Sequence, residues 1–248
     1  MKILVCISHV PDTTSKINFI NGDTEFDTNG VQYVINPNDE FGLTKAVILK
    51  EQQGATVTVV NVGGTDAEAT LRKALAIGAD EAIRVNANAT DRMFVAKQLA
   101  AVVKEGNYDL VIAGKESLDY NGGMVPGMLS AMLDYNFVNS CVGLDITGTD
   151  AKVMREIDGG KETLSTSLPL IVGGQKGLVE EKDLRIPNMR GIMMARSKVL
   201  TVLEPTNDAA ATKAVKFEKP AAKSAVKLVS ADNLDELVNL LHNEAKVI

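Results

Sequence analysis

Side chains that perform bond chemistry are scarce in this sequence. Its 248 residues include only two histidines, His9 and His242, and two cysteines, Cys6 and Cys141. A catalytic triad or a protein-bound metal ion needs several such groups close together, which argues against enzymes of those classes. The cysteines lie far apart and form no CxxC motif. We therefore expect neither a disulfide framework nor a thiolate metal site, and a reducing compartment fits this cysteine usage.

An excess of positive charge and long apolar runs are also missing. The formal net charge is -6 and the pI is about 5.1. Such a chain repels phosphate backbones and anionic lipid heads, so we expect no nucleic-acid partner. The apolar run at residues 3–7 is too short for a signal peptide or a membrane span, and no other segment reaches spanning length. We expect a cytoplasmic protein that is not embedded in a membrane.

The sequence does contain an alternation of short apolar runs and amphipathic stretches over residues 1–135. This alternation is typical of parallel strands joined by helical crossovers. The expected strands cover residues 2–7, 56–62, 81–85 and 109–113. The expected helices cover residues 39–53, a stretch that starts at Thr65 with capping-box spacing to Glu68, and a stretch that starts at Asp91. We predict an α/β fold with a doubly wound, mainly parallel sheet.

The pattern changes after Val138. Residues 152–157 and 161–166 alternate with a period of two around Asp158-Gly159-Gly160, which predicts a tight hairpin, and residues 168–172 are a further strand candidate. Residues 204–227 lack apolar periodicity and predict an extended arm. A helix with one apolar stripe is expected over 232–242. We divide the chain into an α/β domain, residues 1–203, and a C-terminal arm and helix, residues 204–248.

Two loops that follow expected strands could bind a nucleotide. The chain has no GxxxxGK followed by Ser or Thr, and no GxGxxG after a strand, so a nucleotide would be held in another way. Residues 62–66 join a strand end to a helix start, where backbone amides can meet an anion, although an ordinary turn has the same pattern. Residues 113–127 combine glycines with Ser117, Asp119 and Asn121, before a helix expected over 124–133. The alternative for this second loop is a glycine-rich connection without a ligand. His9 follows the first strand and is either a ligand contact or a plain loop residue.

Several motifs along the chain resemble one known family, the beta subunit of electron transfer flavoproteins. The motifs that carry the resemblance are Lys2-Ile3-Leu4-Val5-Cys6-Ile7 with Val10-Pro11-Asp12, Asn36-Pro37-Asn38-Asp39-Glu40, residues 71–80 ending in Gly78-Ala79-Asp80, the loop of residues 117–126, the hairpin of residues 155–160, and residues 184–193 with Ala195, Arg196 and Lys198. The resemblance implies a sheet of the adenine-nucleotide-binding (HUP, Rossmann-like) type. It also implies a heterodimer in which a larger alpha subunit binds most of a redox-active FAD while this chain supplies one wall of the flavin pocket.

The resemblance further implies that this chain alone holds AMP. Carried over by position, the nucleotide contacts would be Cys6, Asn36, Pro37, Asn38, Asp39, Val62, Asp119, Tyr120, Asn121, Gly122, Gly123, Met124, Val125, Pro126 and Gly127. The family pattern has threonine and glutamine at the positions of Gly122 and Met124, so backbone amides would replace two side-chain contacts. A second FAD, as in flavin-bifurcating relatives, is the alternative occupant. Thr13 and Asn38 stand where some relatives have aromatic residues, which implies a more polar flavin wall.

A partner-docking loop is implied around Arg185, Met189 and Arg190. An apolar residue flanked by two arginines suits a transient contact steered by charge; the alternative is that Met189 starts a helix and packs on its own domain. The resemblance implies no catalysis but electron transport, as in fatty acid oxidation, from flavin dehydrogenases such as acyl-CoA dehydrogenases to a quinone oxidoreductase. The alternatives are a subunit of an NADH-dependent bifurcating complex and a stand-alone adenine-nucleotide sensor. An ATP pyrophosphatase is disfavoured because SGGxDS does not follow the first strand.

Overall fold

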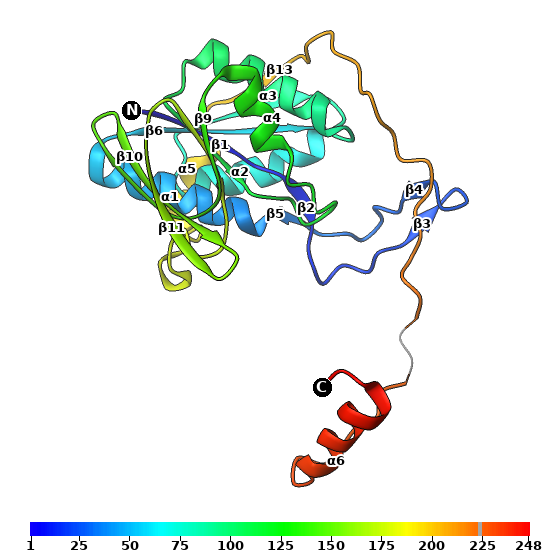
Figure 1. The fold of residues 1–248 in the computed structure, drawn as a ribbon. Coiled ribbons are helices and arrows are strands. Elements are labelled where there is room, and N and C mark those ends of the chain that lie inside the picture. The colour runs from blue at the N-terminus through cyan, green and yellow to red at the C-terminus, as the bar shows by residue number, and fades with distance from the viewer. Residues whose placement is uncertain (223–224) are drawn as a thin grey trace.

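The computed structural model describes residues 1–222 and 225–248; residues 223–224, inside the expected arm, lie outside the described residues. Its centre is a sheet with the strand order β11-β10-β9-β12-β8-β1-β6-β7-β13 (Figure 1). The strands are β1 (Lys2–Cys6), β6 (Thr56–Gly63), β7 (Glu81–Asn86), β8 (Leu110–Gly114), β9 (Asn136–Thr147), β10 (Asp150–Ile157), β11 (Gly160–Ser167), β12 (Leu170–Gly174) and β13 (Leu200–Leu203). All neighbours pair in parallel except β9–β10 and β10–β11.

Helices cover both faces of the sheet, as predicted. The helices are α1 (Pro37–Gln53), α2 (Glu68–Ile77), α3 (Arg92–Gly106), α4 (Val125–Leu133) and α5 (Met189–Ala195). Along β1, Ile3 and Val5 pack in the core beneath α1 and α2, whereas Leu4 and Cys6 pack in the core beneath α3. Successive strand residues point to opposite faces, so a strand buried on both sides needs an unbroken apolar run. That is the doubly wound arrangement that the apolar strands indicated.

The helix boundaries predicted at Gly54 and Asp91 agree with the structure. However, α1 begins at Pro37 and not at residue 39, and the C-terminal helix runs from Leu234 to Ala245 instead of 232–242. The first helix ends at Gly54 with a φ of 67°, and the Asp91 side chain caps α3 by accepting from the amide of Phe94 at 2.7 Å. The capping box predicted for Thr65 and Glu68 is wrong. A 3-10 turn, η1 (Thr65–Ala67), comes first, and α2 begins at Glu68 without a side-chain cap. The Glu68 carboxylate lies 3.2 Å from the buried guanidinium of Arg84 instead.

Three groups of strands were not predicted. The long strand β9 joins the predicted hairpin to the rest of the sheet, and β13 extends the other edge beside β7. Two small ladders also form, one between β2 (His9–Pro11) and β5 (Tyr33–Ile35), and one between β3 (Phe19–Ile20) and β4 (Glu25–Phe26). We call residues 17–27, around the β3–β4 ladder, the finger. These short strands lack a full alternating pattern, so tertiary pairing decides them.

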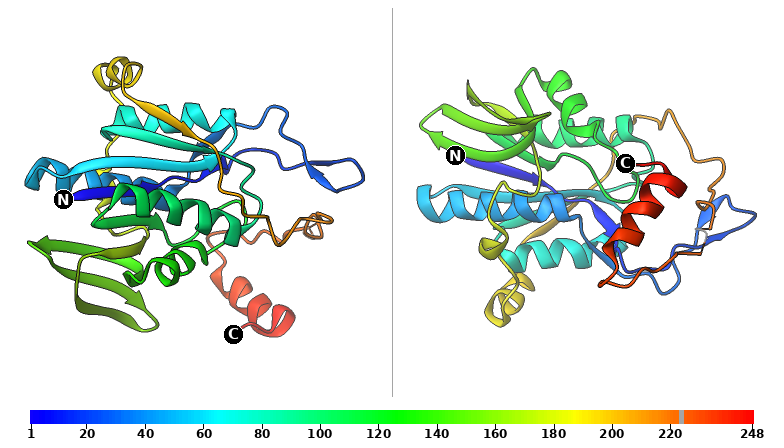
Figure 2. Two further views of the ribbon diagram at one scale, coloured as in Figure 1. Left: turned by 90° about the horizontal axis from the view of Figure 1, so that it is seen from above. Right: turned by 60° about the horizontal axis from the view of Figure 1, so that its bottom comes forward.

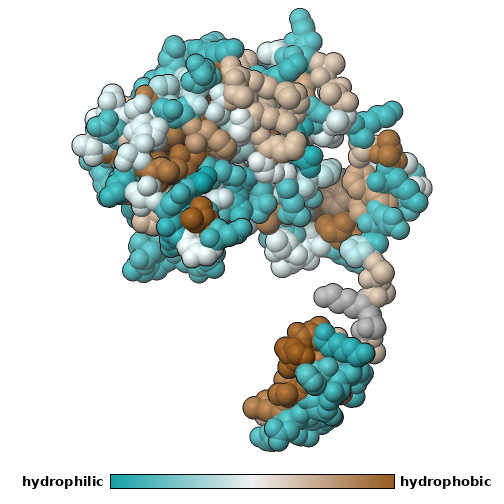
Figure 3. All heavy atoms as spheres, viewed as in Figure 1, coloured by the Kyte–Doolittle hydropathy of each residue, from teal (hydrophilic) through white to brown (hydrophobic). Residues whose placement is uncertain are grey.

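The C-terminal region is an extended arm followed by a helix, as expected. The helix begins as α6 (Leu234–Asn239) and continues as one π-helical stretch, η3 (Leu240–Ala245). A 3-10 turn, η2 (Glu181–Asp183), precedes α5. Figure 1 shows α6 separated from the α/β body. Leu234, Leu237 and Val238 are exposed, and Figure 3 shows their apolar side on this helix. Among the described residues, none of the helices combines the length and the apolarity required to cross a bilayer.

Candidate functional site

A cavity of about 1060 Å³ lies at the carboxyl ends of the parallel strands. Its lining comes from the ends of β1, β6 and β8, from the loops after β7 and β8, and from residues 211–214 of the arm. Open parallel sheets bind ligands at this edge, in particular where the chain leaves neighbouring strands toward opposite faces. Here β1 lies between β6 and β8, and the helices that follow β6 and β8 cover opposite faces. The cavity therefore occupies the position expected of a nucleotide site.

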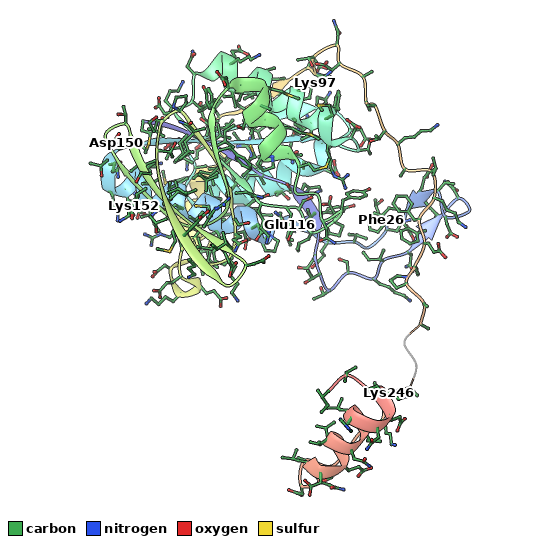
Figure 4. The ribbon with its side chains drawn as sticks, viewed as in Figure 1. Phe26, Lys97, Glu116, Asp150, Lys152 and Lys246 are labelled. Carbon is green, nitrogen blue, oxygen red and sulfur yellow. The ribbon has the colours of Figure 1, made fainter. Side chains whose placement is uncertain are left out.

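The residues named as nucleotide contacts divide into two groups. Those that line the cavity are Cys6, Asp39, Val62, Asp119, Tyr120, Gly122, Met124, Val125 and Pro126. Of the others, Asn36 and Asn38 donate from their side-chain amides to the carbonyl of Glu116, at 2.9 Å and 3.2 Å. The Asn36 Oδ1 atom also accepts from the amide of Leu118 at 3.2 Å. Both asparagines thus bind the backbone of the loop after β8 and do not line the cavity themselves. Figure 4 labels Glu116 on that loop.

The remaining four residues of the predicted set lie at the start of α1, in the loop before α4, or in the first turn of α4. Pro37 is the first residue of α1, where its fixed φ suits a helix start. Asn121 adopts a left-handed backbone with a φ of 47° in the loop before α4. Gly123 lies in that loop, where an added Cβ would meet the Lys115 carbonyl at 3.2 Å, and Gly127 lies in the first turn of α4.

Asp39 joins two strand ends beneath the cavity. Its carboxylate accepts from the amide of Ser8 at 2.7 Å and from the amide of Gly114 at 2.8 Å. An added Cβ at Gly114 would lie 2.2 Å from the Asp39 carboxylate, so only glycine fits beside it. Burial raises the pKa of Asp39 to about 7, against the opposing effect of these hydrogen bonds. The carboxylate therefore fixes the geometry of the cavity floor.

Cys6 forms part of the cavity wall as a neutral thiol. Burial, together with the nearby charge of Asp39, raises its pKa. A thiol acts as a nucleophile through its thiolate, which this environment disfavours. Within the described residues, no group of three or more His, Cys, Asp or Glu side chains could hold a metal ion. The side chains here suit binding better than bond chemistry.

His9 is held firmly in the cavity wall. Its ring stacks on Tyr33 with centroids 4.2 Å apart, and Nδ1 lies 2.8 Å from the hydroxyl oxygen of Thr70. The other nitrogen, Nε2, lies 3.5 Å from the Asp66 carboxylate, at the limit of a hydrogen bond. Burial lowers the pKa of His9, and the Asp66 charge opposes that effect. His9 is therefore an ordered wall residue that a ligand can reach.

Two buried polar atoms of the lining have no hydrogen-bond partner among the described residues: Nε2 of His9 and Oδ1 of Asn61. Asn61 is 4% exposed, and its amide already donates to the carbonyl of Ile7 at 2.8 Å. An unpaired buried acceptor costs about 1–3 kcal/mol. A bound molecule with an N–H or O–H donor would recover that cost.

The sequence prediction missed several parts of the lining. They include Asn61, the loop of residues 86–90 after β7, Arg92 and the arm segment of residues 211–214. Asn61 interrupts the apolar run of β6, and a polar residue in a doubly covered strand was a usable signal. Arg92 directly follows the predicted helix start at Asp91. The arm segment carried no signal, because its return to the body depends on tertiary contacts.

The predicted docking residues lie on and before α5. Met189 is 76% exposed, which excludes the alternative that it packs on its own domain. Arg185 forms an ion pair with Glu51 at 2.6 Å, and Arg190 is exposed. The Arg72 guanidinium anchors the end of this region by donating to the carbonyls of Ala195 and Lys198, both at 2.7 Å. The segment is a surface-exposed knob with apolar and basic side chains.

The fold and the cavity define an α/β protein of the adenine-nucleotide-binding type. Residues 23–208 match the model of the electron transfer flavoprotein domain. The chain is 36% identical to the electron transfer flavoprotein subunit beta of Bacillus subtilis and 35% identical to that of Bradyrhizobium diazoefficiens, and in both comparisons all of each chain is covered. It is 33% identical to the Homo sapiens subunit beta, over 83% of this chain and 82% of the human one.

The chain belongs to the electron transfer flavoprotein family, and it matches beta subunits of that family along its whole length. The predicted resemblance is confirmed. Membership places the chain among electron carriers and not among enzymes. In such proteins the cofactor carries the redox chemistry, and the polypeptide positions it.

Proposed function

We propose that this chain is the small subunit of a heterodimeric FAD-containing carrier. The carrier takes electrons from flavin dehydrogenases, such as acyl-CoA dehydrogenases, and delivers them to a quinone oxidoreductase. The observation that carries the proposal is the match to beta subunits over the whole chain. The FAD is shared with a larger alpha subunit. This chain positions one side of it and excludes water there, while the flavin supplies the electron transfer.

AMP is the proposed occupant of the cavity. The floor made by Asp39, the unpaired acceptor of Asn61 and the glycine-bearing loop before α4 suit an adenosine phosphate. The glycines of that loop leave backbone amides open to a ligand, in place of the two side-chain contacts that this chain lacks. AMP bound only by the folded state would stabilise it in proportion to its concentration above the dissociation constant.

A second FAD is the other candidate for the same cavity. The volume of about 1060 Å³ reaches the top of the range found for small-molecule sites, so a ligand larger than a mononucleotide is compatible with it. The subunit would then belong to an NADH-dependent, flavin-bifurcating complex. The two candidates differ in the number of flavins for each heterodimer.

Cofactor counting tests both candidates. The chain is produced together with the larger subunit of the same source, the complex is purified, and the released cofactors are separated and quantified. One FAD and one AMP for each heterodimer is the expected result. Two FAD and no AMP would favour the bifurcating complex. A chain that folded alone and bound stoichiometric FAD would contradict the proposal, and one that alone bound ATP tightly would favour the stand-alone sensor.

The proposed docking surface is the knob around Met189, with Arg185 and Arg190 beside it. Its exposed methionine can enter an apolar pocket of a dehydrogenase, and the arginines can steer the encounter. We also propose that residues 204–248 form a unit that serves subunit association, since the apolar stripe of α6 is not covered by the described part of this chain.

A further inference from the structure

The first part of the arm is fastened along α3. The Gln98 side chain, 1% exposed, donates to the hydroxyl of Thr206 at 2.7 Å and accepts from the Thr206 amide at 2.8 Å. The preceding residue, Lys97, pairs with Asp208 at 2.7 Å, and Figure 4 shows Lys97 beside the arm. A side-chain amide paired with one residue through both its donor and its acceptor fixes that residue in position and orientation.

A second fastening uses the capping residue of α3. The Oδ1 atom of Asp91 caps the helix, while its Oδ2 atom accepts from the Thr212 amide at 2.9 Å and from the Thr212 hydroxyl at 2.5 Å. Asp91 is 4% exposed. The hydrogen bonds from Thr212 and Phe94 lower its pKa. One carboxylate therefore starts α3 and also holds the arm against it.

Beyond Thr212 the arm passes the mouth of the cavity and reaches the finger. Residues 211–214 line the cavity. The Phe217 ring then stacks on Phe19 at 4.9 Å, and its amide donates to the Asp23 carbonyl at 2.7 Å. Both views in Figure 2 show the arm, in orange, running from the α3 side of the body toward the finger. We call residues 206–217 the strap, because they are attached at both ends and cross the cavity between them.

The charges of the cavity lining are unevenly placed. The lining carboxylates are Asp39, Asp66, Asp91, Glu116 and Asp119, and the lining residues with a permanent positive charge are Arg92 and Lys213. Neither Arg92 nor Lys213 forms an ion pair with another described residue. An anion entering this cavity would be repelled by the lining carboxylates. The permanent positive charges of the lining that would attract it lie at the start of α3 and on the strap.

Arg92 also lies directly against the loop before α4. A Cβ added at Gly122 would lie 2.8 Å from Nε of Arg92, so the guanidinium group passes close to that backbone. The loop, Arg92 and the strap therefore surround one corner of the cavity. Guanidinium and ammonium groups bind phosphate oxygens through charge-assisted hydrogen bonds.

We propose that Arg92 and Lys213 bind the phosphate of an adenosine phosphate ester in this cavity, and that this contact holds the strap closed over the ligand. The inference rests on the proposed nucleotide site and adds the residues that recognise the phosphate and the segment that moves with it. Because the ligand binds the closed strap more tightly than an open one, the ligand shifts the strap toward closure. The strap thereby links binding of a ligand in the cavity to how firmly the arm is held against the α/β body.

The test uses the complete heterodimer, freed of its adenine nucleotide and then titrated with AMP, with FAD and with adenosine. The variants are Lys213→Gln and Arg92→Gln. The control is Lys216→Gln, an exposed lysine of the same strap that does not line the cavity. Each cavity variant is expected to weaken AMP binding by about tenfold, the size of one charge-assisted hydrogen bond, while adenosine binding and the content of shared flavin stay unchanged. Lys213→Arg should restore AMP binding.

Closure of the strap is read by chymotrypsin cleavage after Phe217, a site present in all these variants. AMP should slow that cleavage in the wild type and in Lys216→Gln, but less in Lys213→Gln. Unchanged AMP affinity in both cavity variants, or an equal loss for AMP and adenosine, overturns the phosphate contact while leaving the nucleotide site intact. A wild-type heterodimer that binds neither AMP nor FAD in this cavity overturns the proposed site as well. A preference for FAD over AMP with the same dependence on the variants assigns the contact to the flavin's phosphates.

Discussion

A single carboxylate shows how the cavity floor depends on individual residues. Asp39 accepts hydrogen bonds from backbone amides that follow β1 and end β8, strands that are far apart in the chain but adjacent in the sheet. Glycine at position 114 is required because any side chain would overlap that carboxylate. The buried acid is therefore a structural element, and its titration should be visible in the stability of the protein.

We expect Asp39→Asn to remove a pH-dependent part of the free energy of unfolding. Burial raises the pKa of Asp39 to about 7, whereas an unfolded aspartate titrates near 4, so the native state binds more protons between these values. The contribution of Asp39 to stability must then fall as pH rises from about 4 to about 7. Asparagine also places its side-chain NH₂ group against the backbone amide of either Ser8 or Gly114. Two donors then face each other, which should cost about 1–3 kcal/mol at all pH values.

Urea unfolding of the wild type and of Asp39→Asn at pH 5 and at pH 7.5 measures this effect. The stability advantage of the wild type should be larger at pH 5 than at pH 7.5. Asp158→Asn, in the exposed hairpin turn, is the control and should show the same small difference at both values. An advantage of the same size at both pH values would mean that Asp39 is ionised in the native state across the whole range.

At the scale of elements, a buried arginine holds the Glu68 side chain that was expected to take part in a capping box. The Arg84 guanidinium on β7 donates to the Gly63 carbonyl at 3.0 Å and to the Asn86 side chain at 2.8 Å, besides its ion pair with Glu68. It thereby joins the ends of β6 and β7 to the start of α2. The Glu68 side chain is thus held by a contact from a neighbouring strand, while backbone hydrogen bonds of the η1 turn, from Ala67 to Gly64 and from Glu68 to Thr65, lead into the helix.

Arg84→Met should lower the free energy of unfolding by about 2 kcal/mol or more, because it leaves the Gly63 carbonyl and the Asn86 side chain without their donor. Glu68→Gln removes the other partner of the ion pair, whose side chain is 42% exposed, and should cost less than about 1 kcal/mol. Thermal unfolding of both variants measures the difference between these two losses of stability. Similar losses in the two would place the stabilisation in the ion pair itself.

The knob at α5 is the proposed docking element, and its exposed methionine adds little to folding. Met189→Ala should slow electron transfer from a flavin dehydrogenase by several fold while the flavin content and the melting temperature stay the same, since the side chain is 76% exposed. Stopped-flow reduction of the heterodimer by a reduced dehydrogenase gives the rate. Met154→Ala, an exposed methionine on β10, is the control. Equal rates for Met189→Ala and the wild type would remove α5 from the docking surface.

At the scale of the whole molecule, the C-terminal helix has no partner within the described chain. Its exposed stripe includes Leu234, Leu237 and Val238, and exposed apolar rows on a helix are normally covered by another surface. Deletion of residues 231–248 should therefore weaken association with the large subunit, as measured by gel filtration over a dilution series. The single change Leu237→Asp should also weaken association with the large subunit, whereas Asn243→Asp should not. Complexes of unchanged stability would reject this role for the helix.

The residues by themselves predicted the α/β class, the central parallel strands and the family. Strands buried on both faces need continuous apolar runs, and the helix ends at Gly54 and Asp91 depend on local backbone and capping chemistry, so both leave a readable pattern. The motifs around Asn36 and Gly122 likewise identified two loops that the structure places at one edge of the sheet.

Only the tertiary structure decided which residues close the cavity and how α2 begins. The strap contacts between Thr212 and Asp91, and the contacts of Arg84 with Glu68 and Gly63, join residues that are distant in the chain. No local propensity encodes such contacts, because their free energy exists only after the sheet has brought both partners together. The sequence therefore determined the elements and the chemistry at their ends, whereas packing determined the cavity they form.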